Sequence, residues 1–346
     1  MVGPAEPELP PLGLSEAYRL RWKRRRMLWR ALRARRQLQK VADRTRQIPE
    51  NGVLVFTVLR NEITRLPYFL KHYRQLGAVH FLMIDNGSSD GSAELLASQQ
   101  DVSLWHAGGS YRETRFGLDW AGWLLTRYGH GRWCLTVDAD ELLVYSGMEA
   151  HGLEDLTRLL DRRGRGGFGA LMLDLYPKGP LGSQTYTQEQ NPTEVLQWFD
   201  AGPYRAVRQR PAGNLWVQGG ARERMFFQDQ PERSPTLNKL PLVRWNRRYA
   251  YLNSTHSMLP PQMNALYGGP GGAEPSGGLL HTKFLPEIVS KSATEKQRQQ
   301  HFHTPQQFDG YYDRIGEAPD LWHADAVRYS GPGQLADLGL LSPLAW

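Results

Sequence analysis

The chain has 346 residues, 40% of them hydrophobic and 22% charged, which is enough for one large or two ordinary globular domains with a real core. Its single cysteine, Cys134, excludes an internal disulfide. No apolar run approaches the roughly 18 residues of a membrane-spanning helix, and the first thirty residues show no secretion signal. The sequence therefore predicts a cytoplasmic protein.

The net charge of +7 is concentrated near the N-terminus. Residues 1–49 contain thirteen Lys and Arg against four Asp and Glu, which gives this segment +9 and leaves −2 for the remainder. Because the body of the chain is nearly neutral, a catalytic domain built around a nucleic-acid groove is not expected. We expect a disordered lead-in over residues 1–14 and a basic helix over residues 16–47.

The basic segment over residues 19–46 has three interpretations. Apolar residues fall on one side of it at helical spacing, although arginines interrupt the stripe: Tyr18, Trp22, Trp29 and Leu32. The segment is a solvated basic helix, or it grips an anionic membrane surface through Arg and Trp, which would make the protein peripheral on the inner face of the membrane. RNA or DNA binding is the least favoured of the three.

From residue 53 onward, apolar strands alternate with helical segments, which predicts an α/β fold with a mostly parallel central sheet flanked by helices. The expected strands are residues 53–59, 81–84, 102–105 and 133–137, and the expected helices are residues 62–76, 92–98 and 111–128. Two strands end in acidic residues, Asp85 and Asp138. Ligands bind outside the carboxyl ends of strands in open α/β sheets, so both acids are expected at a site.

The second half of the chain is less regular. It contains a strand over residues 170–176, loops rich in aromatic residues over 177–234, and a Gly- and Pro-rich loop over 268–278 that we interpret as a flexible lid. A strand over 279–285 and a helix over 286–301 follow. We expect one domain over residues 50–315, with a nucleotide-sugar half (50–145) and an acceptor half (146–315), and then a packed tail over 316–346.

The segment Asp138-Ala139-Asp140-Glu141 places two carboxylates at positions i and i+2, on the same side of an extended chain that leaves a strand. Such a pair suits a hard divalent cation that also takes phosphate oxygens. The tripeptide alone is a weak signal, and solvated acids at a strand end are the alternative.

Three motifs together give this segment its context. They are RNE at residues 60–62, DNGSSDG at residues 85–91 and DADE at residues 138–141, each after an expected strand. In this order and spacing they resemble the family 2 type of glycosyltransferases, with the fold called GT-A, and particularly a bacterial branch. The resemblance is strong over about residues 52–145 and extends weakly to about 315.

The resemblance implies a GT-A-like fold and transfer of a sugar, of hexosyl type, from a nucleotide diphosphate sugar to a hydroxyl group, in cell-surface polysaccharide or glycoconjugate synthesis. The donor contacts that it implies are Arg60, Asn61, Glu62, Asp85, Asn86, Ser88, Asp90, Asp138 and Ala139. Asp85 would accept from the base, since a carboxylate can read a pyrimidine imide N–H. A UDP-sugar is the first donor to test. Residues 86–92 also fit a plain connecting turn. Glu62 also fits an acidic residue near the N-terminus of a helix, where it would favour the helix dipole.

Asp138 and Asp140 are the expected metal ligands, and the metal would neutralise the diphosphate leaving group. GT-A enzymes often supply a late histidine, for which His281 is the best positional match. An imidazole ligand favours manganese over magnesium, although His281 fits equally well as a core histidine. Lys283 contacts phosphate or caps its strand, and Arg115 contacts the diphosphate or lies on a solvated helix face.

An inverting transfer needs a carboxylate that deprotonates the acceptor hydroxyl on the face opposite the diphosphate. Glu223, beside a Gly-Gly turn, is the first candidate and Asp229 the second. Glu141 would orient or contact the acceptor, a saccharide or glycoconjugate. The acidic pair that marks the base in family 2 enzymes is not evident, which leaves the base and the inverting outcome open.

Two other functions compete with sugar transfer. A sugar-phosphate nucleotidyltransferase also needs a sheet, a metal and acidic strand ends, but it would open with a glycine-rich phosphate loop where this chain has residues 60–62. A non-catalytic nucleic-acid-binding protein would use residues 19–46 and would leave the DADE segment without a purpose.

Overall fold

The computed structural model describes residues 11–298 and 309–346. The strands of its main sheet are β1 (Leu38–Ala42), β2 (Val53–Leu59), β3 (Ala78–Asp85), β4 (Val102–Ala107), β5 (Trp133–Thr136), β6 (Glu141–Val144), β7 (Gly167–Asp174), β11 (Asn238–Arg244) and β14 (Ser276–His281). The smaller strands are β8 (Trp198–Phe199), β9 (Tyr204–Gln209), β10 (Asn214–Gly219), β12 (Ala250–Asn253), β13 (Ser257–Leu259) and β15 (Val327–Arg328).

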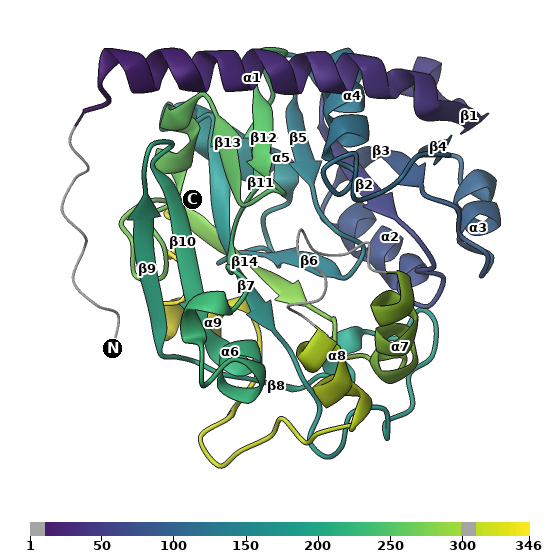
Figure 1. Cartoon of the computed structure of the whole chain (residues 1–346), viewed down its shortest axis with the longest axis vertical. Coiled ribbons are helices and arrows are strands. Elements are labelled where there is room, and N and C mark those ends of the chain that lie inside the picture. The colour runs from purple at the N-terminus through teal and green to yellow at the C-terminus, as the bar shows by residue number, and fades with distance from the viewer. Residues whose placement is uncertain (1–10, 299–308) are drawn as a thin grey trace.

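Helices surround the sheet (Figure 1). They are α1 (Leu14–Ala34), α2 (Leu66–Gln75), α3 (Ser92–Ser98), α4 (Leu118–Tyr128), α5 (Leu153–Arg162), α6 (Gly220–Phe226), α7 (Ile288–Arg298), α8 (Asp309–Gly316) and α9 (Pro332–Asp337). No helix in residues 11–298 and 309–346 is long and apolar enough to cross a bilayer.

The main sheet has the order β1-β4-β3-β2-β5-β11-β7-β14-β6 in the described part of the chain. Strands β4, β3, β2, β5, β7 and β14 run in one direction, and β1, β11 and β6 run against them. The predicted α/β class, with a mostly parallel central sheet between helices and a basic N-terminal helix, is confirmed.

Helices cover both faces of the sheet, and side chains point alternately to the two faces along each central strand. Residues of both kinds are therefore buried. On β2, Val53 and Val55 join a core with residues of α2, α3 and α5. Leu54 and Phe56, on the opposite face, join the larger core to which α4 contributes. Because both faces of β2 are buried, its sequence is an almost continuous run of apolar residues.

The basic segment is not one helix over residues 16–47. Helix α1 ends at Ala34, and residues 38–42 form β1, which pairs antiparallel with β4. Local propensity favours a longer helix, but the otherwise unpaired N–H and C=O groups of β4 provide a partner for an extended chain.

Two further helices begin later than predicted. Helix α2 begins at Leu66 rather than residue 62. Helix α4 begins at Leu118 rather than residue 111, because Arg115, Phe116 and Gly117 have φ values of 54°, 58° and 76°, which no right-handed helix accommodates. Most of the predicted lead-in over 1–14 and the end of the predicted helix over 286–301 lie outside the described residues.

Candidate active site

The carboxyl ends of the parallel strands bring several polar residues to one edge of the sheet. Strand β3 ends at Asp85, β7 at Asp174 and β14 at His281, and Asp138 follows β5 after one residue. The parallel pairing of β7 with β14 places Asp174 directly beside His281. The two predicted acidic strand ends therefore lie at an edge to which the second half of the chain adds further groups.

Three side chains are linked in a row at this edge, the buried His281 and Asp174 and the partly exposed Asp140. The Nε2 atom of His281 lies 3.1 Å from Asp140 Oδ2, and its Nδ1 atom lies 2.6 Å from Asp174 Oδ1. The backbone adds a further link, because Thr282 N donates to Asp140 O at 2.7 Å. Asp140 and His281, which the resemblance implies as ligands of one metal, thus lie side by side, and their role as ligands stays a prediction.

Arginine and histidine charges hold Asp174 in its ionised form. Burial alone would raise the pKa of this carboxyl, but Arg222, whose Nε donates to Asp174 Oδ2 at 2.7 Å, and His281 lower the pKa to about 2. Burial opposes the charged form of His281, yet Asp140 and Asp174 raise the pKa of its imidazole above the ordinary value. Neither Asp174 nor Arg222 was predicted, because each is a single polar residue without a local motif.

Lys239 is a third residue of this edge that the sequence did not indicate. Its buried ammonium on β11 lies 2.8 Å from Glu141 Oε1 and 3.1 Å from Asp138 Oδ2. Burial raises the pKa of Glu141, and Lys239 opposes that rise. Glu141 also accepts from Asp138 N at 3.1 Å, so it holds the turn between β5 and β6. Its predicted contact with the acceptor stays a prediction.

The side chains at this edge include some, but not all, of the ligands of a divalent-cation site. No three His, Cys, Asp or Glu side chains among the described residues are grouped as metal ligands. Asp140 and His281 face each other, whereas Asp138, whose side chain is 52% exposed, is paired with Lys239. A carboxylate and an imidazole whose other nitrogen is held by a buried carboxylate are the chemistry of a metal ligand pair. Mg²⁺-type sites commonly take one or two carboxylates and complete the shell with phosphate and water.

Cations border this group on the side of β14. Buried Arg65 bonds to Glu62 at 2.9 Å and Glu287 at 2.8 Å. The ammonium of Lys283 lies 5.4 Å from the ring centre of Tyr311. Burial would raise the pKa of Asp140, but His281, Arg65 and Lys283 lower it well below its usual range. The edge therefore offers positive charge beside the two candidate ligands.

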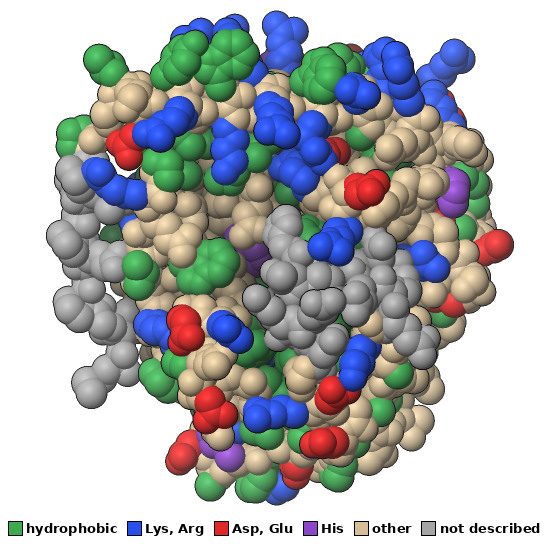
Figure 2. Space-filling model, in the orientation of Figure 1, with side chains coloured by type: hydrophobic (Ala, Val, Ile, Leu, Met, Phe, Trp, Pro, Cys, Tyr) green, Lys and Arg blue, Asp and Glu red, His purple; other side chains and the backbone are tan. Residues whose placement is uncertain are grey.

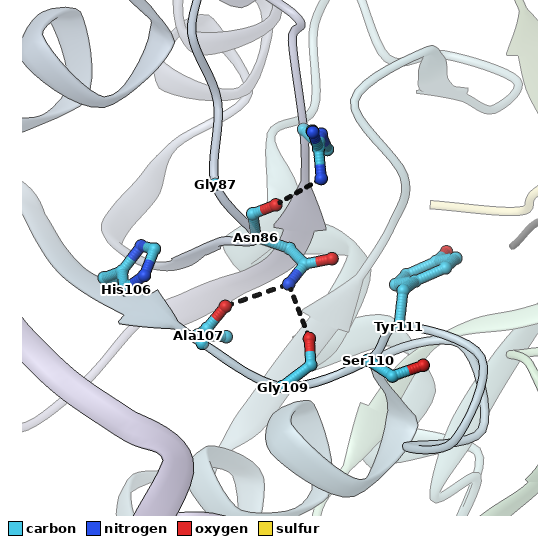
Figure 3. A pocket seen from close by; sticks show the side chains of 9 residues that line it. Asn86, Gly87, His106, Ala107, Gly109, Ser110 and Tyr111 are labelled. Carbon is cyan, nitrogen blue, oxygen red and sulfur yellow. Dashed lines mark hydrogen bonds between the residues drawn. The ribbon is translucent and has the colours of Figure 1, made fainter. Parts of the chain in front are cut away.

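A pocket of about 400 Å³ opens at the ends of β3 and β4. Asn86 shapes it, because its Nδ2 donates to the carbonyls of Ala107 at 2.9 Å and Gly109 at 3.0 Å. Figure 3 shows His106 on one side of Asn86 and Tyr111 on the other. Arg60 also lines the pocket, which thus combines a cation with two flat rings and is within the size range of small-ligand sites.

The predicted donor contacts near this pocket hold two loops together. Asn61 N donates to Ser88 Oγ at 2.8 Å, Ser89 N donates to Asn61 Oδ1 at 2.8 Å, and Ile63 N donates to Asp90 Oδ2 at 3.0 Å. The loop after β2 and the loop after β3 are therefore cross-linked by side chains of both motifs.

The carboxylate of Asp85 accepts hydrogen bonds from backbone N–H groups of the turn that follows it. Its Oδ2 accepts from Gly87 N and from Ser88 N, each at 3.1 Å. His106 Nδ1 lies 3.7 Å away. Contact between Asp85 and a nucleobase stays a prediction.

Two predicted residues, Arg115 and Glu223, have their contacts away from the Asp140–His281 pair. Arg115 bonds to Asp119 and to the carbonyl of Tyr251 at 2.9 Å. Glu223 on α6 pairs with Arg205 and accepts from Ser234 Oγ at 2.7 Å. Asp229 is exposed on the loop after α6. The neighbour of Glu223 on α6, Arg222, is the residue of that helix that reaches Asp174.

The sequence matches no family model and no curated protein sequence. Among solved structures, it is similar to a mannosyltransferase, PcManGT from Pyrobaculum calidifontis in complex with GDP-Man and Mn2+, with 12% identity over 87% of this chain and 79% of that chain and a TM-score of 0.32. A 4-diphosphocytidyl-2C-methyl-D-erythritol synthase matches with 18% identity over 40% of this chain and 68% of its own, at a TM-score of 0.25.

A putative glucose-1-phosphate thymidylyltransferase from Bacillus anthracis, in complex with a sucrose, matches with 8% identity over 40% of this chain and 65% of its own, at a TM-score of 0.23. All three TM-scores are below 0.5.

Proposed function

We propose that this chain is a glycosyltransferase of the GT-A type that moves a sugar from a nucleotide diphosphate sugar to a hydroxyl group of a saccharide or glycoconjugate. One observation supports the proposal: the pocket and the Asp140–His281 pair lie at the same edge of the sheet. The pocket is at the ends of β3 and β4, and the pair is at the ends of β5 and β14. Strand β2 stands between β3 and β5. A nucleoside in the pocket would extend its diphosphate along this edge toward the pair.

A divalent cation on Asp140 and His281, with Asp138 as a third candidate ligand, would neutralise charge that develops on the departing diphosphate. The imidazole favours manganese over magnesium. Lys283 and Arg65 supply permanent positive charge beside these residues. Asp174 keeps the ring of His281 in one orientation, so that Nε2 faces Asp140.

The proton acceptor is the least constrained role. Glu223 is the first candidate and Asp229 the second, and an inverting outcome depends on one of them reaching the acceptor hydroxyl. The contacts of Glu223 with Arg205 and Ser234 would have to be exchanged for the acceptor. Arg60, Asn86 and Asp85 are the proposed nucleotide contacts, with UDP as the first base to test.

Calorimetric titration of the full chain with UDP, with and without Mn²⁺, tests the proposal. Binding that requires the metal, and that is lost in Asp140→Asn and in His281→Ala, supports the donor site. Asp161→Asn is the matched control, because Asp161 on α5 is an exposed partner of Arg244. Arg244 ends β11, which runs against β5, so this pair lies at the opposite edge of the sheet. If UDP, GDP, CDP and dTDP all fail to bind with metal present, the glycosyltransferase assignment is wrong.

A positive titration would be followed by a screen of nucleotide sugars. Release of the nucleoside diphosphate in the presence of saccharide acceptors identifies a transferase. Release of pyrophosphate from a nucleoside triphosphate and a sugar phosphate would instead identify a nucleotidyltransferase and contradict the proposal.

A further inference from the structure

Helix α1 has two opposite faces. At 3.6 residues per turn, its buried residues fall on one side of the helix and its exposed large apolar residues on the other. The buried residues are Leu20, Met27, Ala31 and Ala34. The exposed apolar residues are Leu14, Tyr18, Trp22, Trp29 and Leu32.

The buried face is fixed to the rest of the molecule. Leu20 and Met27 share a hydrophobic cluster with Ala250 and Leu259 of the β12–β13 hairpin. Helix α1 runs along one end of the molecule, across α4 and this hairpin (Figure 1). The outward stripe therefore cannot rotate into the core without breaking these contacts.

The outward face carries aromatic rings among guanidinium groups. Trp22 is 52% exposed and Trp29 is 55% exposed. Arg25 lies 5.4 Å from the ring centre of Trp22, and Arg33 lies 4.5 Å from that of Trp29. Figure 2 shows hydrophobic and Lys or Arg side chains gathered together along the top of the molecule, over α1.

We propose that the outward face of α1 docks on the surface of an anionic phospholipid bilayer. Tryptophan and tyrosine favour the boundary between headgroups and acyl chains, and a neighbouring row of arginines is attracted to anionic headgroups. An interfacial helix places its apolar stripe at the centre and cations at the sides, as α1 does with Arg21 on one side and Arg26 on the other. Arg25 lies within the stripe, over the ring of Trp22. A nucleic acid would use the arginines but would leave Leu14 and Leu32 without a partner.

The docking face is mechanically linked to the pocket at β3 and β4. Arg30 donates to Asp119 Oδ2 at 2.9 Å and to the carbonyl of Glu113 at 2.6 Å, in the segment that follows the pocket residue Tyr111. Beyond the helix, Gln37 O accepts from Gly108 N at 3.3 Å. A bilayer that holds α1 would therefore hold the pocket at a fixed position relative to the membrane, whatever reaction the pocket serves.

Flotation of the full chain with vesicles tests the docking. One set of vesicles is phosphatidylcholine alone, and the other contains phosphatidylglycerol as well. We expect the protein to float with the anionic vesicles only, and the Trp22→Ser/Trp29→Ser variant to lose about tenfold in partitioning. The matched control is Val207→Ser/Leu338→Ser, which removes apolar side chains that are 49% and 40% exposed elsewhere on the surface and should float like the parent.

A second variant, Arg21→Glu/Arg25→Glu, tests the charge and should also lose flotation, while salt should weaken that of the parent. Circular dichroism melts of each variant establish that it folds. Equal flotation of the tryptophan variant and the parent, or no flotation of a folded parent, overturns the proposal. Retention of an RNA or DNA oligonucleotide by a parent that ignores anionic vesicles would assign the face to nucleic acid instead.

Discussion

Asp174 Oδ1 lies 2.6 Å from His281 Nδ1 and fixes the imidazole so that its other nitrogen faces Asp140. The two residues are 107 positions apart in the chain, and only the parallel pairing of β7 with β14 makes them neighbours. Carboxylates in this position commonly set the tautomer and the basicity of a metal-binding histidine. The proposed cation site therefore depends on a residue that does not itself face the cation.

Asp174→Asn should weaken Mn²⁺ binding in the presence of UDP about 10- to 100-fold, because the amide supports the ring of His281 less strongly. Calorimetry gives the affinity, and a thermal melt separates it from unfolding, since Arg222 also loses its buried partner. Unchanged metal affinity in a folded variant would show that His281 is a core histidine and not a ligand.

Protonation of His72 should reduce stability in acid. Burial lowers the pKa of His72 from its ordinary 6.5 to about 4, and its Nε2 lies 2.9 Å from the carbonyl of Leu143. The unfolded chain therefore binds more protons than the folded chain between these values, so this contribution is lost as the pH falls from about 6.5 to about 4. Its full extent is about 3 kcal/mol.

Urea unfolding of the parent and of His72→Gln at several pH values measures this contribution. The difference between the two free energies of unfolding should shrink as the pH falls. The raised pKa of Glu141 makes the protein more stable as the pH falls, which is opposite to the effect of His72. Because both proteins contain Glu141, its contribution cancels in the difference. A difference that does not vary with pH would mean that His72 does not titrate in this window.

Gly169→Ala should destabilise the protein by about 1–3 kcal/mol, because overpacking forces neighbouring atoms to move. A methyl group at this position in β7 would clash with the Cβ and ring atoms of Tyr267. Gly166→Ala is the control, since nothing lies within 4 Å of the added methyl group there. Thermal melts that show equal effects for the two variants would contradict the close contact of β7 with Tyr267.

Arg30→Ala should lower UDP affinity a few-fold with little change in the melting temperature. Its guanidinium joins α1 to Asp119 and Glu113, but the side chain is 34% exposed, so the ion pair itself contributes modestly to stability. Titration with UDP measures the effect, and Arg26→Ala, an exposed arginine of the same helix, is the control. Equal affinities for the parent and both variants would show that α1 does not influence the pocket.

Local patterns in the sequence were sufficient for the α/β class. The apolar run of β2 and the acids at Asp85 and Asp138 mark strands and their ends, because a buried strand and its polar exit are written in consecutive residues. The turn over residues 86–92 could be predicted for the same reason. Asp140 and His281 were expected together only through the resemblance to a known family, and their role as metal ligands stays a prediction.

Tertiary structure alone decided which charges complete the site. Lys239 and Asp174 are single polar residues at buried positions of strands, and their partners come from distant parts of the chain. It also decided that residues 38–42 are a strand, since the free edge of β4 outweighs their helical neighbours. A sequence determines structure most visibly where the deciding contacts are local, and long-range pairing of buried charges leaves no such local pattern.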